Sequence, residues 1–333
     1  MFKGAVTVRK ILGSVLSSIY RAVVVASQAS YRAVPFSIIK VPARVIRVGN
    51  ITWGGTGKTP LVVSLAREFS GSGKKVAVLT RGYGKDEVAE MRKKLPNVPI
   101  LVGRDRIRTA REAVRKYKSE IILLDDGFQH IRLHRDLDIV AINATDPFGP
   151  GGLIPMGTLR EPLENLSRAQ IFILTKSNIG AKNLHWIKQR LLSIKPDAVI
   201  FEAVHQPIQF MDFRRNRFVP LSEIKGKKVG VISAIGDPYS FEKTIENLDA
   251  EILLAARFDD HHFCSESEFT DFLRRCKEVG VKDIMTTEKD FYRMESFFKK
   301  RGSRDVHNFN FLVLQIEFQV NDEEDFIRRC LNP

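Results

Sequence analysis

The chain has 333 residues, of which 44% are hydrophobic and 28% are charged. This composition is typical of a globular protein of two ordinary domains and excludes a disordered, collagenous or coiled-coil protein. Its 53 Lys and Arg residues outnumber its 39 Asp and Glu residues. The resulting net charge of +14 favours an anionic partner such as nucleic acid, nucleotide or an acidic membrane surface. The three cysteines form no CxxC pair, which disfavours a disulfide framework and a cysteine-rich zinc site and fits a reducing compartment.

The first 67 residues contain ten Lys and Arg residues and no Asp or Glu. Residues 5–34 lack proline and predict a helix whose basic and apolar side chains lie on opposite faces. The apolar face carries Val8, Leu12, Val15, Ile19, Val23 and Ala26. Arg21 interrupts the apolar run, so the pattern predicts a helix in the interface of an anionic membrane and not one that spans it. A helix packed on its own domain and a mitochondrial transit peptide remain alternatives.

A glycine-rich turn follows the apolar strand predicted at 45–48 and precedes an apolar helix at 61–69, which is the context of a phosphate-binding P-loop. The predicted nucleotide-binding residues are Thr52, Trp53, Gly54, Gly55, Thr56, Gly57, Lys58 and Thr59. Glycines let backbone N–H groups turn toward phosphate oxygens, and the helix start adds partial positive charge. We expect Lys58 to reach the β- and γ-phosphates of ATP and Thr59 to ligate Mg²⁺.

Two positions in this turn differ from related patterns. Thr52 stands where the strict P-loop pattern has its first glycine. Trp53 stands where the deviant Walker ATPases, which dimerise on membranes or DNA, carry a signature lysine. The sequence therefore argues against that class of ATPase.

A second acidic element lies at 121–126, where four apolar residues end in Asp125 and Asp126. This pattern predicts a buried strand with carboxylates at its carboxyl end, as in a Walker B element. Two adjacent carboxylates are costly to keep ionised without a cation, which favours Mg²⁺. An acidic turn after a strand is common on its own, but together with the P-loop it predicts an MgATP site.

Apolar runs at 76–79, 139–142, 171–174 and 199–202 alternate with helical segments. They predict an α/β fold, namely a P-loop NTPase-like parallel sheet with helices on both faces. The segment 210–218 predicts a hairpin linker, and strand-like runs at 228–233, 251–255, 283–286 and 311–316 predict a second, smaller α/β domain. The predicted division is 1–40 for the basic helix, 41–206 for the P-loop core, 207–220 for the linker and 221–333 for the second domain. We expect the second domain to close the active-site cleft.

Several motifs follow one another along the chain: VGNITWGGTGKTP at 48–60, TRGYG at 80–84, LVGRDR at 101–106, LDDGFQH at 124–130, PMGTLREP at 155–162, FDDHHF at 258–263 and TTEKD at 286–290. In combination they resemble the tetraacyldisaccharide 4'-kinase (lipid A 4'-kinase) family over nearly the whole chain. The resemblance implies transfer of phosphate from MgATP to the 4'-hydroxyl of a tetraacylated, 1-phosphorylated glucosamine disaccharide. It places this reaction at the cytoplasmic face of the bacterial inner membrane, with no nucleic-acid partner.

The resemblance also implies roles for individual residues. The family's Gly-Asp-Glu-Pro element matches residues 85–88, which makes Asp86 the candidate base, and its Asp-His element makes His261 the partner of that base, with Lys58 completing the catalytic set. The implied metal ligands are Thr59, Asp125, Asp126 and Glu161. The implied substrate contacts are Glu87, Arg106, Gln129, His130 and Arg160.

The chain departs from the family in the segment before Asp86. The family separates this element from RGYG by a longer loop, whereas here the two are adjacent, and Lys85 and Val88 replace Gly and Pro. An exposed acid at a helix start is the alternative reading of Asp86. A surface turn is the alternative reading of His261, with His262 as its competitor.

Two other classes of function remain open from the residues alone. The net charge would suit a P-loop ATPase that acts on nucleic acid, although the basic residues gather on an amphipathic helix and are not interleaved with aromatic residues. The shortened segment before Asp86 would suit a membrane-surface P-loop protein without catalytic activity.

Overall fold

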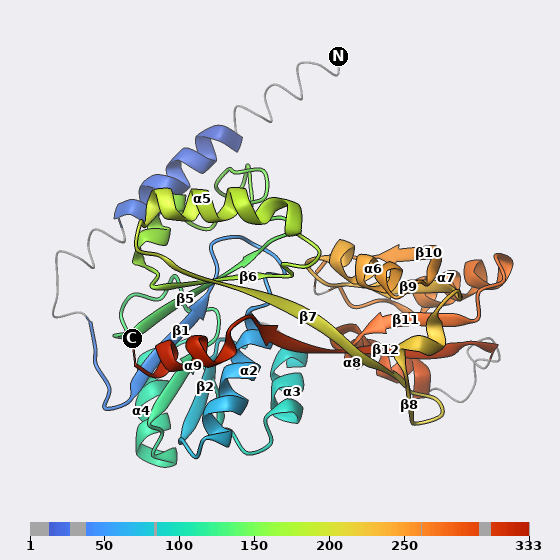
Figure 1. The fold of residues 1–333 in the computed structure, drawn as a ribbon, viewed down its shortest axis with the longest axis horizontal. Helices are drawn as coiled ribbons and strands as arrows, with labels where there is room; N and C mark the ends of the chain where they lie inside the picture. Colours follow the sequence, from blue (N-terminus) through green and yellow to red (C-terminus); the bar gives the residue numbers. More distant parts are fainter. Residues whose placement is uncertain (1–12, 27–37, 83–84, 261, 300–307, 333) are drawn as a thin grey trace. The chain divides into compact units, whose positions relative to one another are not determined.

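The computed structural model describes residues 13–26, 38–82, 85–260, 262–299 and 308–332 (Figure 1). Contacts within the chain divide it into two compact units. Unit 1 comprises Met1–Gly82, Met91–Val204 and Val320–Pro333, and unit 2 comprises Tyr83–Glu90 and His205–Gln319. The division predicted from the sequence is contiguous, whereas each of these units takes in a segment from the other's part of the chain.

Unit 1 is built on a parallel sheet with the strand order β7-β6-β5-β1-β4-β2-β3. Its strands are β1 (Arg44–Gly49), β2 (Val76–Thr80), β3 (Ile100–Val102), β4 (Ile121–Leu124), β5 (Leu137–Asn143), β6 (Ile171–Thr175) and the start of β7 (Val199–Asp212). Its helices are the segment 13–26, α2 (Lys58–Gly71), the end of α3 (Lys85–Lys94), α4 (Arg106–Tyr117), α5 (Leu184–Ile194) and α9 (Glu323–Leu331). Strand β5 is buried at every position, as expected of a parallel strand covered on both faces, and the predicted α/β fold class is confirmed.

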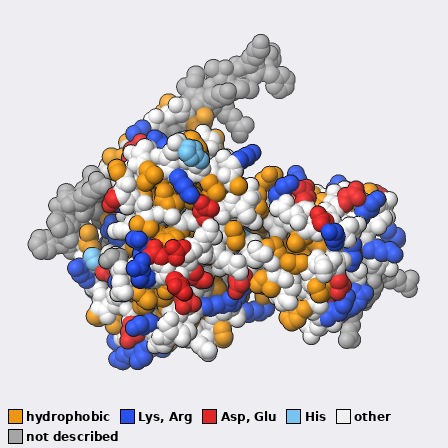
Figure 2. All heavy atoms as spheres, in the orientation of Figure 1, with side chains coloured by type: hydrophobic (Ala, Val, Ile, Leu, Met, Phe, Trp, Pro, Cys, Tyr) orange, Lys and Arg blue, Asp and Glu red, His pale blue; other side chains and the backbone are white. Residues whose placement is uncertain are grey.

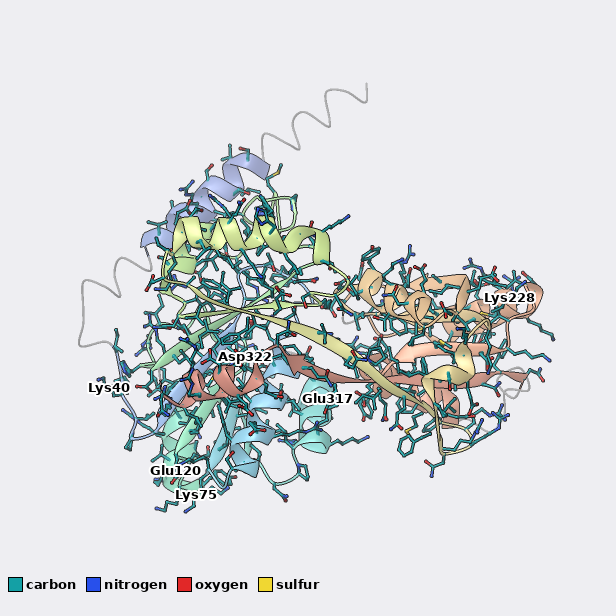
Figure 3. All side chains as sticks on the ribbon, viewed as in Figure 1. Lys40, Lys75, Glu120, Lys228, Glu317 and Asp322 are labelled. Atoms are coloured by element: carbon teal, nitrogen blue, oxygen red, sulfur yellow. The ribbon has the colours of Figure 1, made fainter. Side chains whose placement is uncertain are left out.

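Parallel pairing brings the functional loops of unit 1 to one edge of its sheet. Arg47 of β1 lies beside Leu124 of β4, so the P-loop after β1 and the acidic turn after β4 start at the same level. The amino ends of β2 and β4 lie at the opposite edge. There the N–H of Glu120 donates to the carbonyl oxygen of Lys75 at 2.7 Å (Figure 3). Ligands bind at the carboxyl edge of such sheets, so this edge is where a nucleotide site belongs.

A buried ion pair between Arg47 of β1 and Asp138 of β5 connects two neighbouring strands beneath this edge of the sheet. Both side chains are about 1% exposed, Arg47 Nη2 donates to Asp138 Oδ2 at 2.6 Å, and Arg47 Nε donates to Asp138 Oδ1. Arg47 Nη1 also donates to the carbonyl oxygen of His130. A Cβ atom at position 127 would overlap the Arg47 side chain, which explains the glycine there. One side chain thus connects the P-loop strand, the start of β5 and the turn after β4.

Unit 2 is a smaller α/β unit whose sheet has the order β10-β9-β11-β12-β7, with β8 pairing to β7. Its strands are β8 (Arg217–Val219), β9 (Lys228–Ser233), β10 (Glu251–Arg257), β11 (Asp283–Thr287), most of β12 (Asn310–Val320) and the end of β7. Its helices are the start of α3, α6 (Pro238–Asn247), α7 (Glu266–Glu278) and α8 (Glu288–Lys299). Strands β9, β10, β11 and β12 pair in parallel, and apolar side chains of α6 and α7 pack into two cores around them.

The chain end returns to unit 1. The ring of Phe326 in α9 lies 5.3 Å from the ring of Phe201 in β7, and Arg44 Nε donates to the carbonyl oxygen of Cys330 at 3.0 Å. Acidic residues occupy the first turn of α9 and basic residues its last, which suits the helix dipole. Acidic side chains are gathered in this region of unit 1 in Figure 2. All three cysteines are free and buried, in agreement with the absence of a disulfide framework.

Residues 13–26 form a helix in the structure, and the rest of the predicted helix at 5–34 lies outside the described residues. Its protein-facing side makes polar contacts, because the Ser17 hydroxyl donates to the carbonyl oxygen of Leu153 at 3.0 Å and the Tyr20 hydroxyl to that of Arg160 at 2.9 Å. Among the described residues, no helix has the length and hydropathy that crossing a membrane requires.

The strand predictions are confirmed for each apolar run named from the sequence, and so is the hairpin, in which Phe210 of β7 pairs with Val219 of β8. Strand β3 was not predicted because its three residues are too few to show a periodicity. Strand β7 runs on to Asp212, beyond the predicted 199–202. Its second part was not predicted because it is mostly exposed or half-exposed and lacks a continuous apolar run.

We expect Asp138→Asn to lower the stability of the protein markedly. Removing the carboxylate leaves the Arg47 guanidinium buried without its counter-charge, which costs about 3–5 kcal/mol. The midpoint of urea unfolding, followed by circular dichroism, measures the loss.

The control is Lys188→Met, which removes the partly exposed ion pair of Lys188 with Glu202. Exposed pairs contribute about 0–1 kcal/mol, so this midpoint changes little. Equal midpoints for the two variants would contradict the role given to the buried pair.

Candidate active site

The P-loop occupies the segment between the end of β1 and the start of α2. Gly57 is the N-cap of α2 and has a φ of 77°, and Gly54 has a φ of 121°, backbone conformations that favour glycine. The first turn of α2 has no acidic residue, and its N-cap makes no side-chain hydrogen bond. Lys58 and Thr59 are the first residues of this helix, whose amino end carries the partial positive charge that favours an anion.

The end of β6 supports the P-loop from the side. The Thr175 hydroxyl donates to the carbonyl oxygen of Thr56 at 3.0 Å, and Lys176 Nζ donates to that of Gly55 at 3.2 Å. Lys176 is buried and has a left-handed backbone with φ 55°. Sequence reasoning missed this pair. The available signal was a polar pair directly after a predicted parallel strand, at the edge where ligands bind.

The acidic turn presents its second carboxylate to the P-loop lysine. Asp126 has a left-handed backbone with φ 52°, and its carboxylate accepts from Arg160 Nη1 at 2.8 and 3.0 Å. Lys58 Nζ lies 3.6 Å from Asp126 Oδ1. Burial alone would raise the pKa of the Asp126 carboxyl, but Lys58 and Arg160 hold that pKa below its ordinary value. The carboxylate is therefore ionised at neutral pH, as a cation ligand must be.

Arg160 connects this carboxylate to the indole of Trp53. Its guanidinium lies 5.4 Å from the centre of the Trp53 ring, and the indole is 67% exposed. The next residue, Glu161, is buried and accepts from Arg168 Nη2 and Asn165 Nδ2, each at 2.8 Å. The structure therefore places the predicted metal ligand Glu161 in a buried ion pair with Arg168.

The other predicted substrate contacts in unit 1 hold the acidic turn in place. Arg106, the first residue of α4, is buried and donates from Nη2 to the carbonyl oxygen of Asp125 at 2.9 Å. Gln129 Nε2 donates to the carbonyl oxygen of Asn50 at 3.0 Å, which connects the turn to the P-loop segment. Burial, and then the neighbouring Arg106, lower the pKa of His130 to about 4, so its imidazole is neutral at physiological pH.

The predicted base and its partner belong to unit 2 and are described only in part. Asp86 lies in the first turn of α3, with its side chain outside the described residues, and His261 also lies outside them. Glu87 is described, and its Oε1 lies 3.0 Å from Lys289 Nζ. The competitor His262 bonds through Nε2 to Glu268 Oε2 at 3.1 Å, at the capping box that starts α7.

The oxygen donors at this edge suit Mg²⁺. Within the described residues, no group of three or more His, Cys, Asp or Glu side chains is arranged to hold a metal by itself. Mg²⁺ in nucleotide sites is usually held by one or two carboxylates together with phosphate oxygens and water. Asp125, Asp126 and the Thr59 hydroxyl supply hard oxygen donors of this kind.

The chain is similar to known proteins over nearly its whole length. The profile of the LpxK family, described as tetraacyldisaccharide-1-P 4'-kinase, matches residues 9–332. The tetraacyldisaccharide 4'-kinase of Halothermothrix orenii is 35% identical over 94% of this chain and 89% of its own, and that of Elusimicrobium minutum is 37% identical over 86% and 81%. The crystal structure of LpxK from Aquifex aeolicus in complex with ATP superimposes with a TM-score of 0.66 at 26% identity, covering 94% of this chain and 95% of that chain. The chain therefore belongs to the tetraacyldisaccharide 4'-kinase family, the kinases of lipid A synthesis.

Proposed function

We propose that the chain transfers the γ-phosphate of MgATP to the 4'-hydroxyl of a tetraacyldisaccharide 1-phosphate. The observation that carries this proposal is the shared position of Lys58, Asp126 and Arg160 at the carboxyl edge of the sheet. A P-loop lysine and an acidic-turn carboxylate 3.6 Å apart are the two halves of a phosphoryl-transfer site. The ATP-bound relative from Aquifex aeolicus supports ATP as the donor.

The residues of unit 1 bind and orient the nucleotide. The glycine-rich turn from Thr52 to Thr59 surrounds the phosphates, and Lys58 leaves Asp126 to contact the β- and γ-phosphates. Thr59, Asp125 and Asp126 would hold Mg²⁺, with Glu161 as the fourth implied ligand, and the ion would supply positive charge against the phosphate oxygens. Arg160 then stabilises the charge on the transferred group.

The residues at the start of α3 and before α7 activate the acceptor. Asp86 takes the proton of the 4'-hydroxyl, and His261 orients the carboxylate and helps to carry that proton. Glu87 and Arg106 contribute to substrate binding, together with Gln129 and His130. Because the imidazole of His130 is neutral, its contribution to binding is a hydrogen bond and not an ion pair.

The N-terminal helix seats the enzyme on its lipid substrate. Apolar side chains of the segment 13–26 face solvent, with Ile19 55% and Val23 60% exposed, whereas its protein-facing side makes the polar contacts of Ser17 and Tyr20. Helices of globular proteins normally bury the apolar face, so an exposed apolar face favours contact with an apolar environment outside the protein. We place this helix in the surface of an anionic membrane, at the cytoplasmic face of the bacterial inner membrane.

The same surface extends onto the loops that the helix contacts. The backbone N–H of Met156 donates to the Ser17 hydroxyl at 3.2 Å, and the backbone N–H of Trp53 donates to the carbonyl oxygen of Thr158 at 2.6 Å. The side chains of Met156 and Trp53 are both exposed. Tryptophan favours the membrane interface, so the exposed indole beside the P-loop fits an active site that opens toward lipid.

A nucleic-acid-binding ATPase is the less favoured function. On the face drawn in Figure 2, both units carry acidic as well as basic side chains, and no part of that face is covered by basic side chains alone. A nucleic-acid site requires basic side chains gathered into a patch or stripe. The high net charge is better explained by an anionic lipid surface and an anionic substrate.

We expect purified protein to transfer labelled γ-phosphate from ATP to a tetraacyldisaccharide 1-phosphate in mixed micelles. Lys58→Ala lowers kcat by about 100-fold or more, because it removes the cation that stabilises the moving phosphoryl group. Asp86→Asn lowers kcat to a similar extent and leaves the Kd for ATP unchanged, because it removes only the base.

The control for this assay is Lys74→Ala, an exposed lysine after α2, which keeps the wild-type rate. Absence of a bis-phosphorylated product from wild-type protein that binds ATP would contradict the proposed reaction. It would favour the membrane-surface protein without catalytic activity.

We expect the double change Ile19→Ser and Val23→Ser to weaken binding to vesicles of phosphatidylethanolamine and phosphatidylglycerol by about tenfold or more. Each side chain contributes about 1.5–3 kcal/mol when it leaves water completely. Co-sedimentation at increasing lipid concentration measures the effect, and Val279→Ser, at an exposed apolar position of unit 2, is the control. Identical binding curves for the double variant and the control would remove the helix from the membrane contact.

A further inference from the structure

Lys289 joins two segments of unit 2 that lie far apart in the sequence. Its Nζ is 3.0 Å from Glu87 Oε1 and 3.2 Å from Asp260 Oδ1. Glu87 lies in the first turn of α3, Asp260 lies in the loop after β10, and Lys289 lies in the first turn of α8. The three side chains are only 21–26% exposed, so solvent screens these contacts less than it screens surface ion pairs.

The position of Lys289 is unfavourable for a purely structural lysine. The first turn of a helix carries partial positive charge, which stabilises acidic side chains and destabilises basic ones. The neighbours of Lys289 in that turn, Glu288 and Asp290, follow this preference. Burial alone would lower the pKa of Lys289, but Glu87 and Asp260 raise it, so the side chain is a cation. The two carboxylates thus offset both the dipole and the loss of water.

The two carboxylates flank the residues proposed to act on the acceptor hydroxyl. Glu87 directly follows Asp86, and Asp260 directly precedes His261. Consecutive Cα atoms are about 3.8 Å apart, so fixing one residue restricts where its neighbour can lie. Without a cation between them, Glu87 and Asp260 repel each other, and the two segments lose the contact that Lys289 makes to both.

We propose that Lys289 is a positioning residue for phosphoryl transfer, which holds the segments of Asp86 and His261 in the relative placement that the base and its partner require. This inference rests on the roles given to Asp86 and His261 above. Lys289 does not touch the reacting atoms in this proposal. It acts through the backbone of the two segments, and its loss therefore affects kcat and not the binding of ATP.

The test compares Lys289→Met, Lys289→Arg and Lys227→Met in the micelle assay, with kcat, the KM for ATP and the thermal midpoint measured for each. Lys227 is the matched control, because it pairs with Asp283 elsewhere in unit 2. We expect Lys289→Met to lower kcat by about 100-fold, the loss typical of a displaced catalytic group. Its KM for ATP stays within about twofold of wild type, and Lys289→Arg, which keeps the cation, recovers most of the rate.

A double-variant cycle separates positioning from general damage to the fold. If Lys289 acts through Asp86, adding Lys289→Met to Asp86→Ala causes no further loss of rate. Two results would overturn the proposal. One is a kcat for Lys289→Met within about twofold of wild type, and the other is a double variant whose kcat falls below that of Asp86→Ala by the full factor that Lys289→Met causes alone. If Lys289→Met fails to fold, Asp260→Asn takes its place in the same cycle, and the same two outcomes decide.

The cycle also distinguishes failure of this inference from failure of the proposed function. Inactive wild-type protein contradicts the kinase reaction itself, and full activity of Asp86→Ala contradicts the assignment of the base. The role of Lys289 is decided when wild-type protein is active and Asp86→Ala is impaired. The kcat of Lys289→Met and the rate of the double variant then show whether Lys289 positions the base.

Discussion

The buried ion pair of Arg47 with Asp138 is the constraint on which the nucleotide site depends. Two charges removed from water are tolerated only when each finds its partners, so the strands that carry them cannot shift independently. Arg47 also binds the carbonyl oxygen of His130, and Gly127 leaves room for its stem. The P-loop strand, the start of β5 and the acidic turn are thereby fixed as one piece below the site.

Beyond this ion pair, at the carboxyl edge of the sheet, one carboxylate lies between two cations. Asp126 contacts both Arg160 and Lys58, which keep it ionised despite its burial. Phosphoryl transfer requires little covalent chemistry from the protein and relies on positioning and electrostatic stabilisation. A nucleotide phosphate would pair with Lys58 and Arg160 and a metal ion with Asp126, so each incoming charge would meet an opposite charge already held at the site.

The local part of this arrangement could be predicted from the sequence, and the long-range part could not. The P-loop, the acidic turn and the strands appear as continuous patterns within a few residues, so the fold class and the edge of the sheet that carries Lys58 and Asp126 follow from them. The contacts of Lys176 with the P-loop and of Lys289 with Glu87 join segments more than a hundred residues apart. The hydrophobic periodicity of the sequence gives no information about such long-range pairs. The return of 320–333 to unit 1 is hidden for the same reason.

The central claim is that the P-loop and the acidic turn form a single MgATP site. Its most direct test is the affinity for ATP with and without Mg²⁺, read from the fluorescence of Trp53 in a Trp186→Phe background, with and without Asp126→Asn. We expect Mg²⁺ to tighten ATP binding when Asp126 is present. Asp126→Asn should remove this effect and leave metal-free ATP bound at least as tightly, because Lys58 and Arg160 lose their competing carboxylate. An equal effect of Mg²⁺ in both proteins would contradict the claim.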